Sequence, residues 1–571
     1  MHVIATAGHV DHGKSTLVRV LTGTDPDRFR EEKERGLTID LGFAGLDLPS
    51  GRGVAFIDVP GHVRFLKNML AGVGAVDACV FVVAATEGWK PQSEEHLRIL
   101  ELLGLEHGMV ALTKVGLADD DLRELAHLEV EEQVAGTFLQ GAPVVEVDAL
   151  DGTGVDALVA ALDDLTASTP TAVDHDRPRL WIDRSFAPAG AGTVVTGTLT
   201  GGSVHVDDEV VIGPDRRPAR IRGLQRLGEQ VASIEPGNRT AVNLSGIDHD
   251  DIRRGDALVR ANQWFFTTSV DCEIRVLDTL GRPLSRRGAH RAYLGSGEHP
   301  VSLRVLGPDA IEPGDTGMIR LHLDEPVPLV MGDRFVLRDA GPGMTVGGGA
   351  VLDVDPVRKA AKAAPDRDID RIVRERGWTT VADLERLTGT RRAPDLGDWV
   401  VDPEARDVLV EEVTAAIADA GSIGLDIAQL DDRARAVVGT LHGVIVDQGR
   451  VREADADDLF AGHPLLAALE GAKFAPPSAA EVGTDPAEVR ELVKHGLVIE
   501  SDGVLFAPSA VDEAAERLRR ALDEQPTGLT IAEVRDLLDT SRKYVLALMG
   551  HFDSTGRTRR RDDVRIAGPR L

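Results

Sequence analysis

Three patterns of hydrophobic and polar positions follow one another along the chain. From residue 1 to about 168, apolar runs typical of strands alternate with stretches typical of helices. This alternation predicts a parallel sheet with helices on both faces. The strongest apolar run, 78–85, is far shorter than the ~20 residues that a membrane-spanning helix needs. We therefore expect a soluble protein without a membrane partner.

The rest of the chain divides into a strand-rich and a helix-rich region. A linker that contains Pro and Asp, roughly 169–178, precedes a region to about 356 in which short strands alternate with Gly, Pro and Asp turns. This second pattern predicts β-barrels. After residue 356, groups of helices each end in a short strand pair, as at 444–451 and 497–506. That order predicts winged helices, a variant of the helix-turn-helix.

Together these patterns predict a multidomain fold. An α/β domain is followed by two β-barrel domains and four tandem winged-helix domains, of which the first is short and has no clear third helix. The predicted boundaries are 1–168 for the α/β domain, 179–263 and 264–357 for the barrels, and 358–404, 405–456, 457–510 and 511–571 for the winged helices.

Residues 8–15 match the phosphate-binding pattern G-x-x-x-x-G-K-[ST]. They lie between a predicted strand, 3–7, and a predicted helix that begins at Thr16. Backbone N–H groups and the helix N-terminus can hold a phosphate chain, Lys14 can reach the outer phosphates, and Ser15 offers a hydroxyl to Mg²⁺. The predicted nucleotide-binding residues here are Gly8, His9, Val10, Asp11, His12, Gly13, Lys14, Ser15 and Thr16.

Two later loops carry the groups that a third phosphate requires. Thr38, on a polar loop, can coordinate Mg²⁺ when that phosphate is present, and Asp58, after the predicted strand 54–57, is placed to hold Mg²⁺ through water. Gly61 offers a backbone N–H to the terminal phosphate. His62 follows at the position where a side chain that orients water is needed.

Together these residues resemble the translational GTPases, the class that includes elongation factor Tu. The resemblance implies GTP and GDP as ligands, with Mg²⁺ held by Ser15, Thr38 and Asp58. It also implies that Thr38 and Gly61 sense the third phosphate, and that His62 orients the attacking water once the ribosome is engaged. Val10 and Leu37 match an apolar gate that keeps His62 away until then.

The segment that should read guanine departs from this class. The class uses Asn/Thr-Lys-x-Asp, whose aspartate accepts two hydrogen bonds from the base, whereas this chain has Thr113-Lys114 followed by Gly116 at the aspartate position. Asp119 could supply the missing carboxylate, or the backbone or Asp148 could read the base. Asp148-Ala149 stands where the class has Ser-Ala. The residues expected at the base are Thr113, Lys114, Asp148 and Ala149.

The first barrel carries a more specific resemblance. The form I-D-R-S-F…G-A-G-T-V-V-T-G-T at 182–198 is similar to the selenocysteine-specific elongation factors, which also carry four winged helices after their core. A selenol is more acidic than a thiol, so selenocysteine on a tRNA is anionic at neutral pH, and fixed cations can distinguish it from serine. By resemblance, Asp183 and Arg239 line the aminoacyl pocket, and Arg184 is a weaker candidate.

Positive charge is concentrated at the end of the chain. The whole chain has 94 acidic and 64 basic residues, a net charge of −30, so a nucleic-acid partner needs a local basic patch. Residues 541–571 hold eight basic and three acidic residues and supply such a patch. The residues expected to contact a folded RNA are Arg542, Lys543, Arg557, Arg559, Arg560 and Arg561.

The resemblance implies a factor whose GTP form carries selenocysteinyl-tRNA to the ribosome, while its tail binds a SECIS-like mRNA hairpin beside a UGA codon. We expect a monomer. We also expect it in the reducing cytoplasm, since the two cysteines, Cys79 and Cys272, lie far apart in the sequence. One alternative is a general elongation or initiation GTPase with other cargo, against which the tail counts. Another is an RNA-binding adaptor with a degenerate nucleotide domain, supported only by Gly116.

Overall fold

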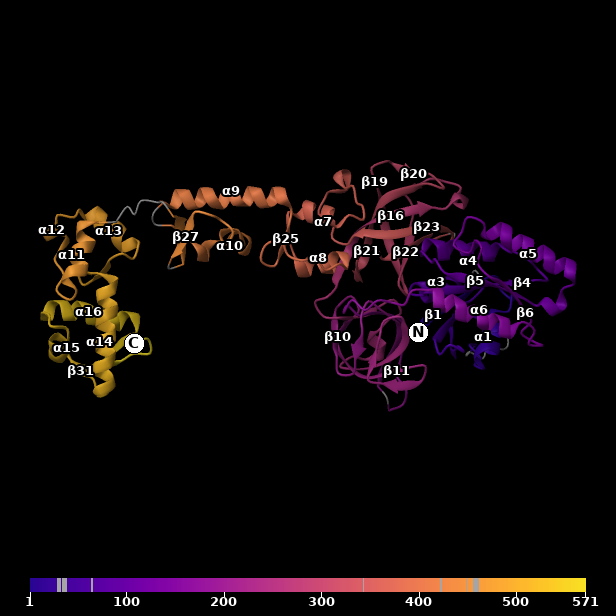
Figure 1. Cartoon of the computed structure of the whole chain (residues 1–571), viewed down its shortest axis with the longest axis horizontal. Helices are drawn as coiled ribbons and strands as arrows, with labels where there is room; N and C mark the ends of the chain where they lie inside the picture. The colour runs from indigo at the N-terminus through magenta and orange to yellow at the C-terminus, as the bar shows by residue number, and fades with distance from the viewer. Residues whose placement is uncertain are drawn as a thin grey trace. The chain divides into compact units, whose positions relative to one another are not determined.

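The computed structural model describes residues 1–27, 32, 38–62, 65–190, 192–341, 343–421, 424–447, 449–454 and 462–571. They form two compact units, 1–406 and 407–571. The first unit holds the α/β domain and both barrels, and the second holds helical modules (Figure 1). The predicted multidomain fold class is therefore confirmed.

The first domain contains a six-stranded sheet in the order β2-β3-β1-β4-β5-β6. Its strands are β1 (His2–Ala7), β2 (Gly42–Asp47), β3 (Gly53–Asp58), β4 (Ala78–Ala84), β5 (Gly108–Thr113) and β6 (Val144–Val147). Its helices are α1 (Lys14–Thr22), α3 (Leu66–Val73), α4 (Pro91–Leu102), α5 (Asp120–Val134) and α6 (Val155–Ser168). β2 pairs antiparallel with β3, so the prediction of a parallel sheet is wrong at this edge and right for the other pairs. Residues 48–52 connect the two strands, too short a segment for the crossover that parallel strands need.

Side chains of the central strands alternate between two hydrophobic layers. Val3 and Ala5 pack with the cluster under α3, α4 and α5, whereas Ile4 packs with the cluster under α1 and α6. β4 is buried along its whole length, as a strand covered on both faces must be. The predicted placement of helices on both faces is confirmed.

Two antiparallel barrels follow. The first has the order β10-β15-β7-β8-β14-β11-β12 and is closed by a β10–β11 pairing. Its strands are β7 (Arg179–Phe186), β8 (Thr193–Thr200), β10 (Glu209–Ile212), β11 (Arg217–Arg226), β12 (Glu229–Val231), β14 (Asn238–Ser245) and β15 (Ala257–Arg260), with a small pair of β9 (Val204–His205) and β13 (Ser233–Ile234). The second barrel is closed in the order β16-β21-β19-β18-β22-β23. Its strands are β16 (Phe265–Val276), β18 (His290–Leu294), β19 (Gly297–Leu306), β21 (Thr316–Leu329), β22 (Arg334–Asp339) and β23 (Thr345–Asp353), with a small pair of β17 (Leu284–Ser285) and β20 (Ala310–Ile311).

A short helical module packs against the second barrel. It consists of α7 (Ile369–Arg376), β24 (Trp378–Thr380), α8 (Val381–Thr388) and β25 (Trp399–Val401). Ile372 and Leu384 belong to the same hydrophobic cluster as the barrel strands. Arg371 also pairs with the buried Asp353 of β23, with 3.3 Å between Nη1 and Oδ2. Hydrophobic and ionic contacts thus fix this module to the barrel.

The second unit contains the remaining modules. Its elements, beginning with the helix that leads into it, are α9 (Pro403–Ala420), β26 (Leu425–Asp426), α10 (Asp432–Val438), β27 (Val444–Asp447), β28 (Arg450–Glu453), α11 (Pro464–Ala472), α12 (Ala479–Val482), α13 (Pro486–Lys494), β29 (Ile499–Ser501), β30 (Val504–Phe506), α14 (Pro508–Glu524), β31 (Leu529–Thr530), α15 (Ile531–Leu538), α16 (Arg542–Thr555), β32 (Thr558–Arg561) and β33 (Val564–Ala567). One hydrophobic cluster, which includes Phe506 and Phe552, extends through the last two modules. Among the described residues, no helix is long and apolar enough to cross a membrane.

Candidate functional site

The loop between β1 and α1 has a backbone that only glycine permits at two points. Gly8 has φ 128°, and a Cβ built there would lie 2.1 Å from the Val82 carbonyl oxygen. Gly13 has φ 91° and directly precedes α1. Both values lie in the region that glycine tolerates and bulkier residues avoid. The motif therefore forms a tight turn that leads directly into the N-terminus of α1.

The side chain of Lys14 is buried against this loop and bonds to its backbone. Its Nζ donates to the carbonyl oxygens of Gly8 (3.1 Å) and His9 (2.7 Å), and the residue is 5% exposed. Burial lowers the pKa of the Lys14 ammonium to about 8, although Asp58 and Asp11 oppose the shift. A phosphate group entering the loop would supply the negative charge that favours the protonated ammonium.

Three oxygen-bearing side chains meet beside the loop. Ser15 Oγ donates to Asp58 Oδ2 (2.6 Å) and lies 2.8 Å from Thr38 Oγ1. Asp58 also accepts a hydrogen bond from Thr6 Oγ1 (2.7 Å), and burial raises the pKa of its carboxyl to about 6. Hydroxyl and carboxylate oxygens are the donors that Mg²⁺ prefers. The three side chains predicted to bind Mg²⁺ thus lie together, and their oxygen atoms are suitable ligands for that ion.

A cavity of about 460 Å³ opens next to these groups. The predicted residues that line it are Val10, Asp11, Gly13, Lys14, Ser15, Thr16, Thr38 and Gly61. Gly61 lies so close to the loop that a Cβ there would be 2.8 Å from the Val10 nitrogen. The ring of His62 packs against Phe65, with 5.9 Å between centroids. Leu37, the other predicted gate residue, lies outside the described residues.

Sequence reasoning missed two polar residues that support the loop from α4. Gly8 N donates to His96 Nδ1 (3.1 Å), and Val10 N donates to Gln92 Oε1 (3.1 Å). Burial lowers the pKa of His96 to about 3, so its imidazole is neutral and can accept. The only signal in the sequence was two polar side chains four positions apart on one helix, a spacing that puts them on the same face.

Residues expected at the base lie around the ends of β5 and β6. Thr113 Oγ1 donates to the His12 carbonyl oxygen (2.6 Å), which ties β5 to the phosphate loop. Gly116 N donates to Asp148 Oδ2 (3.0 Å). Asp119, by contrast, caps α5 by accepting a hydrogen bond from Leu122 N (2.9 Å). The structure therefore places Asp148, and not Asp119, beside the position that lacks a side chain; Ala149 follows Asp148 at the end of β6.

A second cavity, about 550 Å³, lies between the edge strand β2 and the first barrel. Arg184 and Arg239 line it, and Arg239 makes a two-pronged ion pair, at 2.6 and 3.0 Å, with Asp183, which is buried and does not itself line the cavity. The guanidinium of Arg239 lies 3.3 Å from the ring centroid of Phe43, and that of Arg184 lies 4.5 Å from the same centroid. Both candidate cations therefore pack against the same aromatic ring, a contact that the sequence does not predict. Arg184 also donates to the Leu41 carbonyl oxygen.

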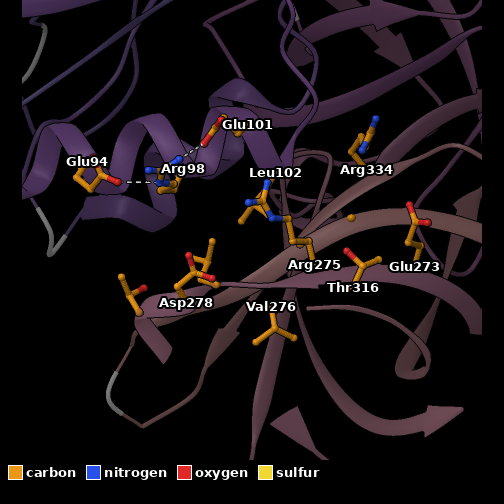
Figure 2. Close-up of a pocket in the computed structure, with 14 residues that line it drawn as sticks. Glu94, Arg98, Glu101, Leu102, Glu273, Arg275, Val276, Asp278, Thr316 and Arg334 are labelled. Atoms are coloured by element: carbon orange, nitrogen blue, oxygen red, sulfur yellow. Dashed lines mark hydrogen bonds and ion pairs between the residues drawn. The ribbon is translucent and has the colours of Figure 1, made fainter. Parts of the chain in front are cut away.

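Another cavity, of about 380 Å³, lies between α4 and the second barrel (Figure 2). Figure 2 shows Arg98 between Glu94 and Glu101, and the ion-pair distances are 2.7 Å to each. Acidic side chains outnumber basic ones in its lining, four to three. Its lining includes none of the predicted site residues. It also has no excess of positive charge that would favour a phosphate chain.

The six predicted RNA-contacting residues of the last module fall into two groups. Arg542 and Lys543 begin α16, and β32 carries Arg559, Arg560 and Arg561; all five are exposed. Arg557 differs, because its Nη2 lies 3.0 Å from Asp512 of α14. Five of the six predicted RNA contacts are thus presented to solvent, and the sixth is partly neutralised.

Comparisons with known proteins agree along the chain. Residues 1–168 match the family description "Elongation factor Tu GTP binding domain" and 192–259 match "Elongation factor Tu domain 2". Residues 274–358 match "Selenocysteine-specific elongation factor, beta-barrel domain", and 520–567 match "Elongation factor SelB, winged helix".

Similar curated proteins carry one name, selenocysteine-specific elongation factor. The protein of Desulfomicrobium baculatum is 41% identical over 62% of this chain and 55% of its own length. That of Escherichia coli is 36% identical over 67% of this chain and 62% of its own length, and that of Haemophilus influenzae is 28% identical over 99% and 98%. The first two alignments thus span less than two thirds of those relatives.

Solved structures extend the likeness to the whole fold. A bacterial selenocysteine-specific elongation factor, EF-Sec, superposes with a TM-score of 0.72 at 25% identity and covers 99% of both chains. The SelB factor of Methanococcus maripaludis in complex with the GTP analogue GppNHp has a TM-score of 0.55 at 24% identity, over 62% of this chain and 80% of that one. This second likeness concerns the fold alone.

Proposed function

We propose that the chain is a selenocysteine-specific elongation factor, as its likeness to proteins of that name supports, and that its GTP form delivers selenocysteinyl-tRNA to the ribosome at UGA codons marked by an mRNA hairpin. The observation that carries this proposal is that Arg184 and Arg239 line one cavity and both pack against Phe43. A selenolate is anionic and a serine hydroxyl is neutral, so two guanidinium groups in one cavity favour the former, while Asp183 holds Arg239 in position and offsets part of its charge.

The first domain binds GTP or GDP and hydrolyses GTP. Backbone N–H groups of the loop before α1 hold the phosphates, and Lys14 contacts the outer ones. Ser15, Thr38 and Asp58 would hold Mg²⁺, which when bound neutralises charge on the phosphates. The hydrogen bonds among these three side chains support that assignment.

His62 orients the water that attacks the terminal phosphate, and Gly61 presents its N–H to that phosphate. The close approach of Gly61 to Val10 supports a role for this segment at the end of the phosphate chain. The packing of His62 against Phe65 is consistent with a side chain that must be repositioned, here by the ribosome, before hydrolysis proceeds.

The last module binds the mRNA hairpin through α16 and the β32–β33 hairpin. Exposed arginines can contact phosphates and stack on unpaired bases. This arrangement separates the message from the cargo, since the aminoacyl pocket belongs to the first unit and the basic residues to the second.

A protection assay tests the proposal. The GTP form of the full-length protein should slow hydrolysis of the ester of selenocysteinyl-tRNA and leave seryl-tRNA on the same tRNA unprotected. Arg239→Ala should abolish this difference, whereas Arg222→Ala, at an exposed position of β11, should not. Equal protection of both esters would indicate a general elongation or initiation factor. Protection of neither, without GTP hydrolysis on ribosomes, would indicate an RNA-binding adaptor.

A further inference from the structure

We infer that the carboxylate of Asp148 reads the guanine base, in place of the side chain that Gly116 lacks. The inference rests on the proposed binding of GTP and names the residue that makes this binding specific. Asp148 is 6% exposed and lies at the carboxyl end of β6, beside the loop that follows β5. In sheets of this type, ligands bind outside the carboxyl ends of the strands.

The position of the carboxylate carries the inference. A Cβ built on Gly116 would lie 2.7 Å from Asp148 Oδ2. This is close to the distance between an aspartate's own Cβ and its carboxylate oxygens. The Asp148 carboxylate therefore occupies the space into which an aspartate at 116 would extend, and a side chain at 116 would collide with it. A side chain at 116 would therefore require the Asp148 carboxylate to move.

Two backbone N–H groups hold the Asp148 carboxylate in place. Oδ2 accepts from Gly116 N (3.0 Å) and Oδ1 accepts from Leu150 N (2.9 Å). Each carboxylate oxygen has two lone-pair sites, so one on each oxygen remains for a ligand. Guanine presents adjacent N1–H and N2–H donors, and a fixed carboxylate matches such a pair with two parallel hydrogen bonds.

Neighbouring carboxylates are less suited to this task. Asp119 is exposed and its Oδ1 caps α5. Asp151 is exposed, its Oδ1 accepts from Thr153 N (2.8 Å), and its Oδ2 lies 3.7 Å from the Cβ position at Gly116. Only the Asp148 carboxylate combines burial, two backbone anchors and contact with the Gly116 position among these three.

Nucleotide competition on the full-length protein tests the inference. Wild type should prefer GTP to XTP and ATP. Asp148→Asn should bind GTP roughly tenfold to a hundredfold more weakly, the scale of a missing hydrogen bond to a charged group. It should bind XTP better, because xanthine carries a carbonyl where guanine carries the 2-amino group, and an Asn amide can donate to it. Asp119→Asn and Asp151→Asn should keep the wild-type ratio.

The outcomes separate the inference from the proposed function. A wild type that does not prefer GTP to ATP would overturn the proposed function, and the inference with it. A GTP-selective wild type whose ratio is unchanged by Asp148→Asn, or changed instead by Asp119→Asn, would overturn the inference alone.

A second pair of variants covers the case in which Asp148→Asn fails to fold. Gly116→Asp in the wild type should weaken GTP binding, because two carboxylates would share one space. The same change in an Asp148→Ser background should strengthen GTP binding at least tenfold, since it returns a single carboxylate to the base. If Gly116→Asp weakens binding in both backgrounds, Asp148 does not read the base.

Discussion

The phosphate loop and the last winged helix both gather positive charge, but in opposite surroundings. Lys14 is 5% exposed and donates to two backbone carbonyls, whereas Arg559, Arg560 and Arg561 are exposed on one short strand. Charge interactions are stronger and less screened by salt in a buried site than at the surface. The loop therefore depends on a few strong contacts, while the basic module depends on many weak ones.

This difference matches the two ligands. A nucleotide is small and can be enclosed, so a buried site can hold each of its phosphates with dedicated groups. A folded RNA is too large to enclose, and its phosphates are met by exposed cations whose combined contribution falls with salt. The comparison predicts large effects of single substitutions near the loop, independent of salt, and smaller, salt-dependent effects in the last module.

The largest effect is expected from His62→Ala. If His62 only orients water, GTP and tRNA binding should stay near normal while ribosome-stimulated hydrolysis slows by ~10²–10⁴-fold. Single-turnover phosphate release, with nucleotide affinity measured in parallel, checks this. His175→Ala, at an exposed linker position, is the control. An equal loss of nucleotide binding would show that His62 is structural.

The chemistry of the phosphate loop could be predicted from sequence because its residues are contiguous. The spacing of Gly8, Gly13, Lys14 and Ser15 determines both the turn and its ligand. Gln92 and His96 could not be predicted, since their role arises only when α4 packs against the loop. The antiparallel β2 was missed because strand direction depends on the length of the connection, which the periodicity does not contain.

The aminoacyl pocket shows the same limit. Asp183 and Arg239 stand 56 residues apart, and their ion pair follows from the antiparallel pairing of β7, β8 and β14. Phe43 belongs to another domain, so no local pattern could connect it with either arginine. Sequence also left the missing carboxylate open between Asp119 and Asp148, because spacing does not show that Asp119 is used as a helix cap.

The next effect concerns pH. Burial lowers the pKa of His96 from 6.5 to about 3, so the unfolded state binds more protons than the folded state between these values. The group's contribution to stability is complete above pH 6.5 and declines as pH falls, by ~1.4 kcal/mol per pH unit. Between pH 6.5 and 5, wild type should therefore lose about 2 kcal/mol more than His96→Asn, whose amide oxygen can still accept from Gly8 N.

Denaturant unfolding of the first domain, at pH 6.5 and at pH 5, measures this difference in the free energy of unfolding. Raising the salt from low to moderate concentration should change it little, because the imidazole is buried. His175→Asn, which changes an exposed histidine, should follow wild type. Identical pH dependence of wild type and His96→Asn would mean that His96 titrates as a solvated histidine, and the contrast between the two regions would lose one of its supports.

The smallest effect, and the one most sensitive to salt, is expected from Arg542→Ala with Lys543→Ala. Both side chains are exposed at the start of α16, and each can neutralise one phosphate. Hairpin RNA binding should weaken by roughly tenfold, and the log–log slope of affinity against salt should become shallower by about 0.7–0.9 for each phosphate that is no longer neutralised. GTP binding and protection of selenocysteinyl-tRNA should persist, because those sites belong to the first unit.

A matched double variant distinguishes specific contacts from a loss of positive charge. Arg519 and Arg520 of α14 are also exposed, but both pair with Glu516, at 2.9 and 3.0 Å. Arg519 also pairs with Asp523, at 3.4 Å. Replacing both arginines with Ala removes the same charge as the α16 variant, and should leave the salt slope close to that of wild type, since both guanidinium groups are already paired with carboxylates. Equal slopes for the two double variants would show that net charge alone attracts RNA. If the α16 variant instead failed to protect the tRNA and kept the hairpin, the last module would serve the cargo, and the separation of message from cargo between the two units would be reversed.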